Sequence, residues 1–145
     1  MTKVFVYGTL LKGFGNHARH LESSKFIGAA VTQKQYTMFK SGIPFVNKEF
    51  PNYPIIGEVY EVNAAVLQGL DRLEGHPEWY YREPIPVVLK ETGEVITASI
   101  YFNDHVANRM LAIGDFKTNE YVDFRKNSVQ APDTQSPAQE PSTTL

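Results

Sequence analysis

The sequence predicts an α+β domain built on a mainly antiparallel or mixed sheet. Strand-like segments outnumber helix-like ones, and they follow one another with few helices between them. No internal repeat of strand, helix and strand is evident, which argues against a repeating βαβ fold. The chain has 145 residues, of which 42% are hydrophobic, so it is long enough for one domain with a substantial core.

The strand-like segments begin near the N-terminus. Residues 4–6 are β-branched and aromatic and predict a buried strand, which ends at Gly8 because glycine makes a tight turn least costly. Similar runs, or an alternation of apolar and polar residues, predict four further strands at residues 25–31, 36–39, 43–46 and 56–62.

One helix has clear signals at both of its ends. Asn63 is a favourable N-cap for a helix over residues 64–73, and Gly75 is well placed to end it. The chain then predicts two strands at residues 85–90 and 95–102, joined by a hairpin turn at residues 91–94. Residues 105–113 are expected to form either a second helix or an irregular cover over the sheet.

The composition changes at Ala131. From there on, prolines stand among Asp, Thr, Gln and Ser with almost no apolar residue. Such a segment cannot bury enough surface to offset its ordering entropy. We therefore expect a folded domain over residues 1–127, followed by a disordered tail over residues 128–145.

Charge and composition exclude several classes of protein. A net charge of −2 gives no electrostatic reason to expect a nucleic acid or an anionic membrane as partner. The absence of cysteine excludes a disulfide scaffold, a thiol nucleophile and thiolate metal sites. No signal peptide is apparent, and no apolar run approaches the roughly 20 residues of a membrane span. We expect a cytoplasmic protein, whose oligomeric state the sequence does not predict.

Two stretches together predict a small-molecule site. The first strand stops on Gly8 and Thr9, and such a turn can present consecutive backbone N–H groups to a carboxylate or an oxyanion. On a helical wheel, Glu74 falls about 50° from the centre of the apolar face. A carboxylate on that face is costly to bury unless it is paired or used in chemistry. The alternative is that the last helical turn frays and that Glu74 points to solvent.

Other motifs in the same region are weaker. Residues 8–13 have the glycine spacing of a phosphate loop but lack the lysine and hydroxyl residue that this motif needs next. Residues 13–18 match a relaxed dinucleotide fingerprint without its βαβ context. His17 and His20 would share a face of a helix, but no third metal ligand is obvious, so we expect solvated or hydrogen-bonded histidines.

The neighbours of Glu74 leave two questions open. Asp71 lies one turn earlier but toward the polar side of the wheel, so a pair of catalytic carboxylates is only weakly supported. Trp79 is expected to pack against the edge of the sheet. A tyrosine hydroxyl next to it could orient the acid or the substrate, but the doublet of Tyr80 and Tyr81 does not show which ring faces inward.

Four blocks of sequence resemble one known family. In chain order within residues 3–103 they are Val4-Phe5-Val6-Tyr7-Gly8-Thr9-Leu10-Leu11-Lys12-Gly13, Gly57-Glu58-Val59-Tyr60, Leu70-Asp71-Arg72-Leu73-Glu74-Gly75 and Tyr80-Tyr81-Arg82. Together they resemble the γ-glutamylcyclotransferase-like superfamily, and within it the γ-glutamylamine cyclotransferases and their AIG2-like relatives. The resemblance implies a small mixed β-barrel with peripheral helices and a pocket at one mouth.

The resemblance also implies roles for particular residues. The family's substrate-holding loop falls on Tyr7, Gly8, Thr9 and Leu10. Its catalytic glutamate falls on Glu74, its tyrosine six residues later on the substrate-binding candidate Tyr80, and the next arginine on Arg82. Leu73 stands where many relatives have phenylalanine. Residues 33–54 show no clear alignment with the family, and there we expect the specificity for the leaving group to be set.

The implied function is a cyclotransferase of the lyase or acyltransferase type. It would convert a small γ-glutamyl amine or amide to 5-oxoproline and a free amine. The substrate's own α-amine attacks its γ-carbonyl, so one glutamate can serve as base and then as acid, and no metal or organic cofactor is required. The alternatives are a non-catalytic small-molecule-binding module with the same pocket, and a related lyase or amidohydrolase acting on another small amide.

Overall fold

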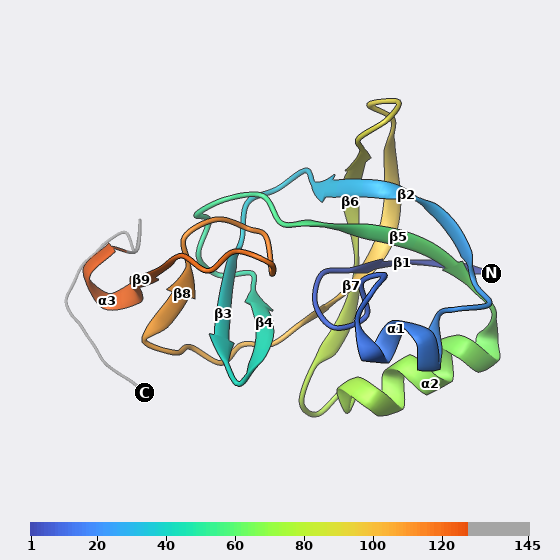
Figure 1. Cartoon of the computed structure of the whole chain (residues 1–145), viewed down its shortest axis with the longest axis horizontal. Helices are drawn as coiled ribbons and strands as arrows, with labels where there is room; N and C mark the ends of the chain where they lie inside the picture. Colours follow the sequence, from blue (N-terminus) through green and yellow to red (C-terminus); the bar gives the residue numbers. More distant parts are fainter. Residues whose placement is uncertain (128–145) are drawn as a thin grey trace.

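The structure, a computed structural model, describes residues 1–127 (Figure 1). Its strands are β1 (Thr2–Val6), β2 (Lys25–Thr32), β3 (Thr37–Ser41), β4 (Ile43–Asn47), β5 (Ile56–Val62), β6 (Tyr81–Leu89), β7 (Val95–Phe102), β8 (Arg109–Leu111) and β9 (Tyr121–Asp123). Its helices are α1 (Gly15–His20), α2 (Ala64–Glu74) and α3 (Phe124–Asn127). Every strand predicted from the sequence is present, with β6 beginning earlier than expected. The tail expected over residues 128–145 lies outside the described residues.

Five of the strands close into a small barrel. In the order β1, β5, β2, β6 and β7, each strand pairs antiparallel with the next. A parallel contact between Val4 of β1 and Ser99 of β7 then closes the ring. The β6–β7 turn contains Gly93 with φ of 77°, as the hairpin signal predicts. This closed mixed barrel with peripheral helices confirms the α+β fold class that the sequence and the family resemblance predict.

The core of the barrel is packed with large apolar side chains. Phe5, Val59 and Ile100, from three different barrel strands, are completely buried. The packing requires a glycine at one position, because a Cβ atom at Gly57 would lie 2.2 Å from the carbonyl oxygen of Val6. The first strand and its neighbour β5 are therefore held in close contact, and the chain that follows β1 leaves the barrel at a fixed place.

The other strands extend the sheet away from the barrel. β4 joins the barrel through one parallel contact between Val46 and Phe102 of β7. β3 and β4 form a hairpin with Gly42 at its tip, where φ is 80°. β8 pairs with the outer edge of β3, and β9 pairs with β8. In Figure 1 this extension lies to the left of the barrel, with α3 beyond it.

The excursion that carries the β3–β4 hairpin leaves and re-enters the barrel at one place. Val31 of β2 pairs directly with Ile56 of β5. The N–H of Thr32 donates to the carbonyl oxygen of Ile55 at 2.9 Å, and the Thr32 hydroxyl accepts from the N–H of Ile55 at 2.8 Å. These hydrogen bonds hold together the two ends of the excursion over residues 33–55, and we call this place its tied neck. The neck fixes the position of the hairpin relative to β1.

The helix α2 has the ends that the sequence predicts. Asn63 accepts a hydrogen bond from the N–H of Val66 through its side-chain oxygen at 2.8 Å, and Gly75 adopts the left-handed conformation with φ of 69°. Leu70 is completely buried beneath the helix. α1 lies against α2 on the same side of the barrel (Figure 1). None of the helices in residues 1–127 is long and apolar enough to span a membrane.

Of the two alternatives for residues 105–113, the helix is wrong, and the irregular chain is found only before residue 109. The segment begins as irregular chain and then forms β8 along the free edge of β3, where Met110 pairs with Phe39. Side-chain amides hold its start out of a helix. Asn103 accepts from the N–H of His105 at 2.8 Å, and Asn47 donates to the carbonyl oxygen of His105 at 3.2 Å. The local sequence pattern could not reveal that this segment would pair with the free edge of β3.

Candidate active site

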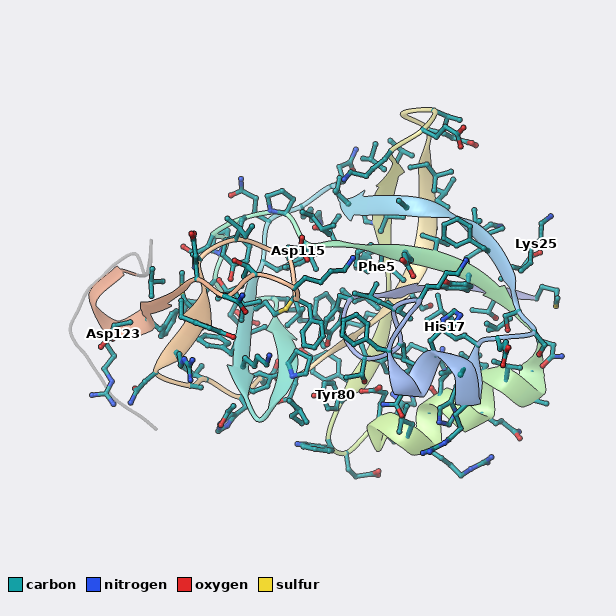
Figure 2. The ribbon with its side chains drawn as sticks, in the orientation of Figure 1. Phe5, His17, Lys25, Tyr80, Asp115 and Asp123 are labelled. Carbon is teal, nitrogen blue, oxygen red and sulfur yellow. The ribbon has the colours of Figure 1, made fainter. Side chains whose placement is uncertain are left out.

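A cavity of about 270 Å³ opens beside the end of β1. Four parts of the chain form most of its walls: the end of β1 with the turn that follows it, the β3–β4 hairpin, the end of α2, and the segment leading into β6. Its lining includes all the residues that the sequence marks as candidates, namely Tyr7, Gly8, Thr9, Leu10, Glu74 and Tyr80. Figure 2 shows Tyr80 between the β3–β4 hairpin and α2.

The turn after β1 is fixed by hydrogen bonds to its flanks. The carbonyl oxygen of Gly8 accepts from the N–H of Leu11 at 2.9 Å, and the side-chain amide of Asn16 donates to the Thr9 hydroxyl at 2.8 Å. Within residues 1–127, no hydrogen bond uses the backbone N–H groups of Gly8, Thr9 or Leu10. Three consecutive donors in the lining of a cavity are available to an anionic group of a ligand.

The reason for glycine at position 8 differs from the one that the sequence suggested. Gly8 does not have a positive φ, so the turn does not require a backbone conformation that only glycine adopts readily. A Cβ atom at this position would instead lie 2.8 Å from Cγ of Pro44 on β4. Gly8 therefore permits the close approach of the turn to the β3–β4 hairpin. The predicted requirement for a glycine-specific turn is corrected to a requirement for space.

Glu74 is the last residue of α2, and its side chain lies in the wall of the cavity. Within residues 1–127, its carboxylate has no hydrogen-bond donor and no ion-pair partner. Burial raises the pKa of Glu74 from the ordinary 4.5 to about 7. The alternative of a frayed last turn with Glu74 in solvent is excluded. A carboxyl group with this pKa can both accept and release a proton near neutral pH.

Asp71, one turn earlier on α2, is paired instead. Arg82 of β6 donates to both of its oxygens, each at 2.9 Å, and the Tyr101 hydroxyl donates to Oδ1 at 2.6 Å. Burial acts to raise the pKa of Asp71, but the hydrogen bonds from Arg82 and Tyr101 outweigh it and lower the pKa. Arg82, which the family pattern singles out, thus binds α2 to the barrel and is not part of the cavity lining.

Buried tyrosines surround the acid. The Tyr7 hydroxyl donates to the carbonyl oxygen of Tyr101, and the Tyr80 hydroxyl donates to the carbonyl oxygen of Pro44, both at 2.8 Å. Burial raises the pKa of Tyr7 and Tyr80, and the charge of Glu74 adds to the shift in both. These phenols therefore stay protonated at neutral pH and shape the cavity as neutral groups.

The tyrosine doublet is resolved by the start of β6. Tyr80 is buried in the cavity wall, and its N–H donates to the carbonyl oxygen of Glu74 at 3.2 Å. Tyr81 points elsewhere, and its hydroxyl donates to the carboxylate of Asp104. Because strand residues alternate in direction, the doublet becomes interpretable only once the strand is known to begin at residue 81.

The outer edge of the cavity is apolar. Three of its lining side chains are large, hydrophobic and exposed: Ile43 at 41%, Leu73 at 36% and Trp79 at 56%. Trp79 therefore does not simply pack on the sheet edge, as expected, but lies at the rim. Sequence analysis also missed Asn16, Lys40, Tyr101 and Phe116. Nothing in their local sequence connects them with Glu74, because they come from other segments of the chain.

The two histidines of α1 have other neighbours. His17 Nδ1 lies 3.1 Å from the carbonyl oxygen of Leu10, and its ring packs against Tyr60 with centroids 5.3 Å apart. In the part of the chain that the structure describes, no three His, Cys, Asp or Glu side chains are grouped so that they could hold a metal ion. The acid and the backbone donors are thus the polar groups that the cavity offers for chemistry, together with Lys40.

Fold and cavity together define a small closed barrel with an unpaired acid facing a pocket of small-molecule size. The sequence profile described as gamma-glutamyl cyclotransferase, AIG2-like, matches residues 4–121. A Methanocaldococcus jannaschii protein provisionally assigned as a gamma-glutamylcyclotransferase is 42% identical over 117 residues, covering 81% of this chain and 97% of that protein. The gamma-glutamylaminecyclotransferase C of Danio rerio is 38% identical over 110 residues, covering 68% of this chain and 72% of that enzyme.

Solved structures give the same result. The crystal structure of an AIG2-like protein from Mus musculus superposes with a TM-score of 0.66 at 28% identity, covering 74% of this chain and 80% of that one. The chain belongs to the gamma-glutamyl cyclotransferase, AIG2-like family. This membership confirms the resemblance that the four sequence blocks suggest, and with it the prediction of an enzyme of the cyclotransferase type.

Proposed function

We propose that this protein converts a small γ-glutamyl amine or amide to 5-oxoproline and a free amine, with Glu74 as general base and general acid. The observation that carries the proposal is the half-buried carboxylate of Glu74, which lies in the wall of the cavity and has no partner within residues 1–127. Its partial burial raises its pKa to about 7. An acid kept unpaired in a cavity is costly unless a ligand uses it.

The chemistry needs no nucleophile from the protein. Glu74 takes a proton from the substrate's α-ammonium, and the freed amine attacks the γ-carbonyl carbon to form a tetrahedral intermediate. The protonated Glu74 gives this proton to the leaving nitrogen, and the bond from the γ-carbonyl carbon to that nitrogen breaks. The Glu74 carboxylate then takes the second proton from the ring nitrogen, which leaves the neutral five-membered lactam, and passes it to the departing amine. Holding the two ends of the substrate in alignment is worth roughly 7–11 kcal/mol, which the narrow cavity and its buried tyrosines would provide.

The turn after β1 has a defined part in this proposal. The γ-carbonyl oxygen becomes negatively charged in the tetrahedral intermediate, and backbone N–H groups placed in advance stabilise such a charge. The N–H groups of Gly8, Thr9 and Leu10 are the available donors in the cavity lining. They could serve either this oxyanion or a carboxylate of the substrate.

The size and rim of the cavity support a small substrate with a variable leaving group. A volume of about 270 Å³ fits a γ-glutamyl group, and the apolar rim would contact the part of the amine nearest to the scissile bond. The relatives are named for both γ-glutamyl and γ-glutamylamine substrates. The identity of the amine is therefore a question for direct measurement.

The test is to incubate the purified protein with γ-glutamyl-lysine, γ-glutamyl alkylamides, γ-glutamyl amino acids and glutathione, and to detect 5-oxoproline by mass spectrometry. The E74Q variant is the control for the chemical step. Release of 5-oxoproline and amine in equal amounts by the wild type alone supports the proposal. Release of free glutamate would show an amidohydrolase instead, and tight binding of these compounds without turnover would show a binding module.

A further inference from the structure

Lys40 places a cation in the wall of the same cavity. It lies on β3, opposite Pro44 in the β3–β4 hairpin, and both residues line the cavity. Its Nζ atom lies 4.8 Å from the ring centroid of Phe116, which is also part of the lining. The contact with this aromatic face keeps the charged end of the side chain, and not just its methylene stem, at the cavity wall.

The ammonium group has no anionic partner among residues 1–127. The ion pairs in this part of the chain involve Lys3, Lys48 and Arg82, and none involves Lys40. Lys40 is half-buried, and its ammonium group gains no carboxylate partner within the described residues. Among the described residues that line the cavity, only Lys40 and Glu74 are charged, and they do not pair with each other.

An unpaired cation and an unpaired acid in one cavity match a ligand that carries both charges. We propose that Lys40 binds a carboxylate of the substrate and so sets specificity in this pocket, an inference that rests on the function proposed above. Glu74 serves the α-ammonium of the γ-glutamyl group, while Lys40 serves an anionic group nearby. That carboxylate belongs either to the γ-glutamyl group itself or to the leaving amine, as in a γ-glutamyl amino acid.

The hairpin location fits a role in specificity. Lys40 and Ile43 lie on either side of the hairpin tip, so one short segment contributes both the cation and part of the apolar rim. An alkyl chain on the leaving group can contact Ile43, Leu73 and Trp79 while a carboxylate contacts Lys40. If Lys40 takes the α-carboxylate, the backbone donors of residues 8–10 are left for the oxyanion.

The test uses two substrates that differ only in one carboxylate. These are γ-glutamyl-propylamide and γ-glutamyl-α-aminobutyrate, whose leaving amines share the same carbon chain apart from that group. Lys40→Met keeps the apolar stem and removes the charge, and Lys40→Arg keeps the charge. We expect Lys40→Met to lower kcat/KM about 10-fold, mainly through KM, and Lys40→Arg to retain most of it.

The pattern across the two substrates identifies the carboxylate. A loss with both substrates, together with weaker calorimetric binding of 5-oxoproline, assigns Lys40 to the α-carboxylate. A loss confined to γ-glutamyl-α-aminobutyrate assigns it to the leaving group. Unchanged kcat/KM for both substrates in Lys40→Met would overturn the proposal.

Arg109 offers a matched control. It also stacks on an aromatic ring, 4.1 Å from the centroid of Tyr121. Arg109 shares a neighbouring hollow with Lys40 but does not line the cavity that contains Glu74. If Arg109→Met lowers kcat/KM as much as Lys40→Met, the effect comes from overall charge and the proposal is wrong. If the wild type releases no 5-oxoproline, the proposed function fails by itself, whereas calorimetric binding of the two amides to wild type and Lys40→Met still tests Lys40.

Discussion

The last two turns of α2 carry carboxylates with opposite surroundings. Asp71 is held by a guanidinium and a phenol from two barrel strands, and its pKa is lowered. Glu74 has no partner among residues 1–127, and burial raises its pKa to about 7. The two side chains are three residues apart on one helix. The surroundings of Asp71 nevertheless stabilise its ionised form, whereas burial destabilises the ionised form of Glu74.

This contrast separates a structural carboxylate, Asp71, from Glu74, the carboxylate that we propose for the chemistry. The ion pair of Asp71 with Arg82 joins α2 to β6. It therefore fixes the position of the end of the helix beside the cavity. Glu74 at that end then needs no partner to be held in place, because the helix positions it. The same substitution, carboxylate to amide, should therefore have opposite consequences at the two positions.

The largest expected effect is on catalysis by Glu74→Gln. The amide keeps the shape of the side chain but cannot accept the proton, so we expect kcat to fall by about 10² to 10⁴-fold with ligand binding retained. Steady-state kinetics and calorimetric binding of 5-oxoproline measure the two quantities separately. A variant with a near wild-type rate would remove Glu74 from the mechanism.

The second effect is on stability, and its sign is unusual. The folded-state pKa of about 7 lies above the ordinary 4.5, so the ionised Glu74 costs stability above pH 7 and this cost disappears below pH 4.5. Glu74→Gln avoids the cost and should stabilise the fold at pH 8, by on the order of 3 kcal/mol. Urea unfolding at pH 8 and pH 4.5 gives the difference, which should shrink at the lower pH.

The third effect has the opposite sign. The lowered pKa of Asp71 means that its pairing stabilises the fold above its ordinary pKa of 3.8 and is lost as the pH falls through the folded-state value. Asp71→Asn should therefore lower the free energy of unfolding at pH 7, by about 1–3 kcal/mol. The same urea measurements at pH 7 and pH 3 test this. Equal destabilisation at both values would contradict the pairing.

The smallest effect concerns the phenol that shares Asp71 with Arg82. Tyr101→Phe removes the hydrogen bond of 2.6 Å to Asp71 and keeps the buried ring, so we expect a loss of about 1 kcal/mol at pH 7. In an Asp71→Asn background the same substitution should cost less, since its charged acceptor is gone. Purely additive losses in this double-mutant cycle would show that the phenol and the carboxylate do not act together.

The helix and its acid were largely predictable from local sequence. Asn63 and Gly75 mark its ends, and the apolar periodicity places Glu74 near the buried face. Asp71 was the harder case, because the wheel puts it toward the polar side while its partners come from positions 82 and 101. A local pattern reports which face a residue lies on but not which distant strand will meet that face.

The same limit explains the other differences. The close contact of Gly8 with Pro44, the cation at Lys40 and the pairing of residues 109–111 with β3 all depend on where the β3–β4 hairpin stands. The hairpin lies outside the four sequence blocks that suggest the family, although the family profile spans it. The barrel strands, in contrast, have strong alternation or β-branched runs and were predicted with little error.

The tied neck of residues 33–55 has a consequence for how such an enzyme can diversify. Because Val31 and Ile56 pair directly and the backbones of Thr32 and Ile55 join beside them, barrel closure does not depend on what lies between. We infer that another hairpin can replace this one while Glu74, the residue proposed to transfer the proton, stays unchanged on α2. Replacing this one segment could then change which amines the cavity accepts. The residue proposed for the reaction and the residues proposed for selectivity would therefore be able to evolve separately.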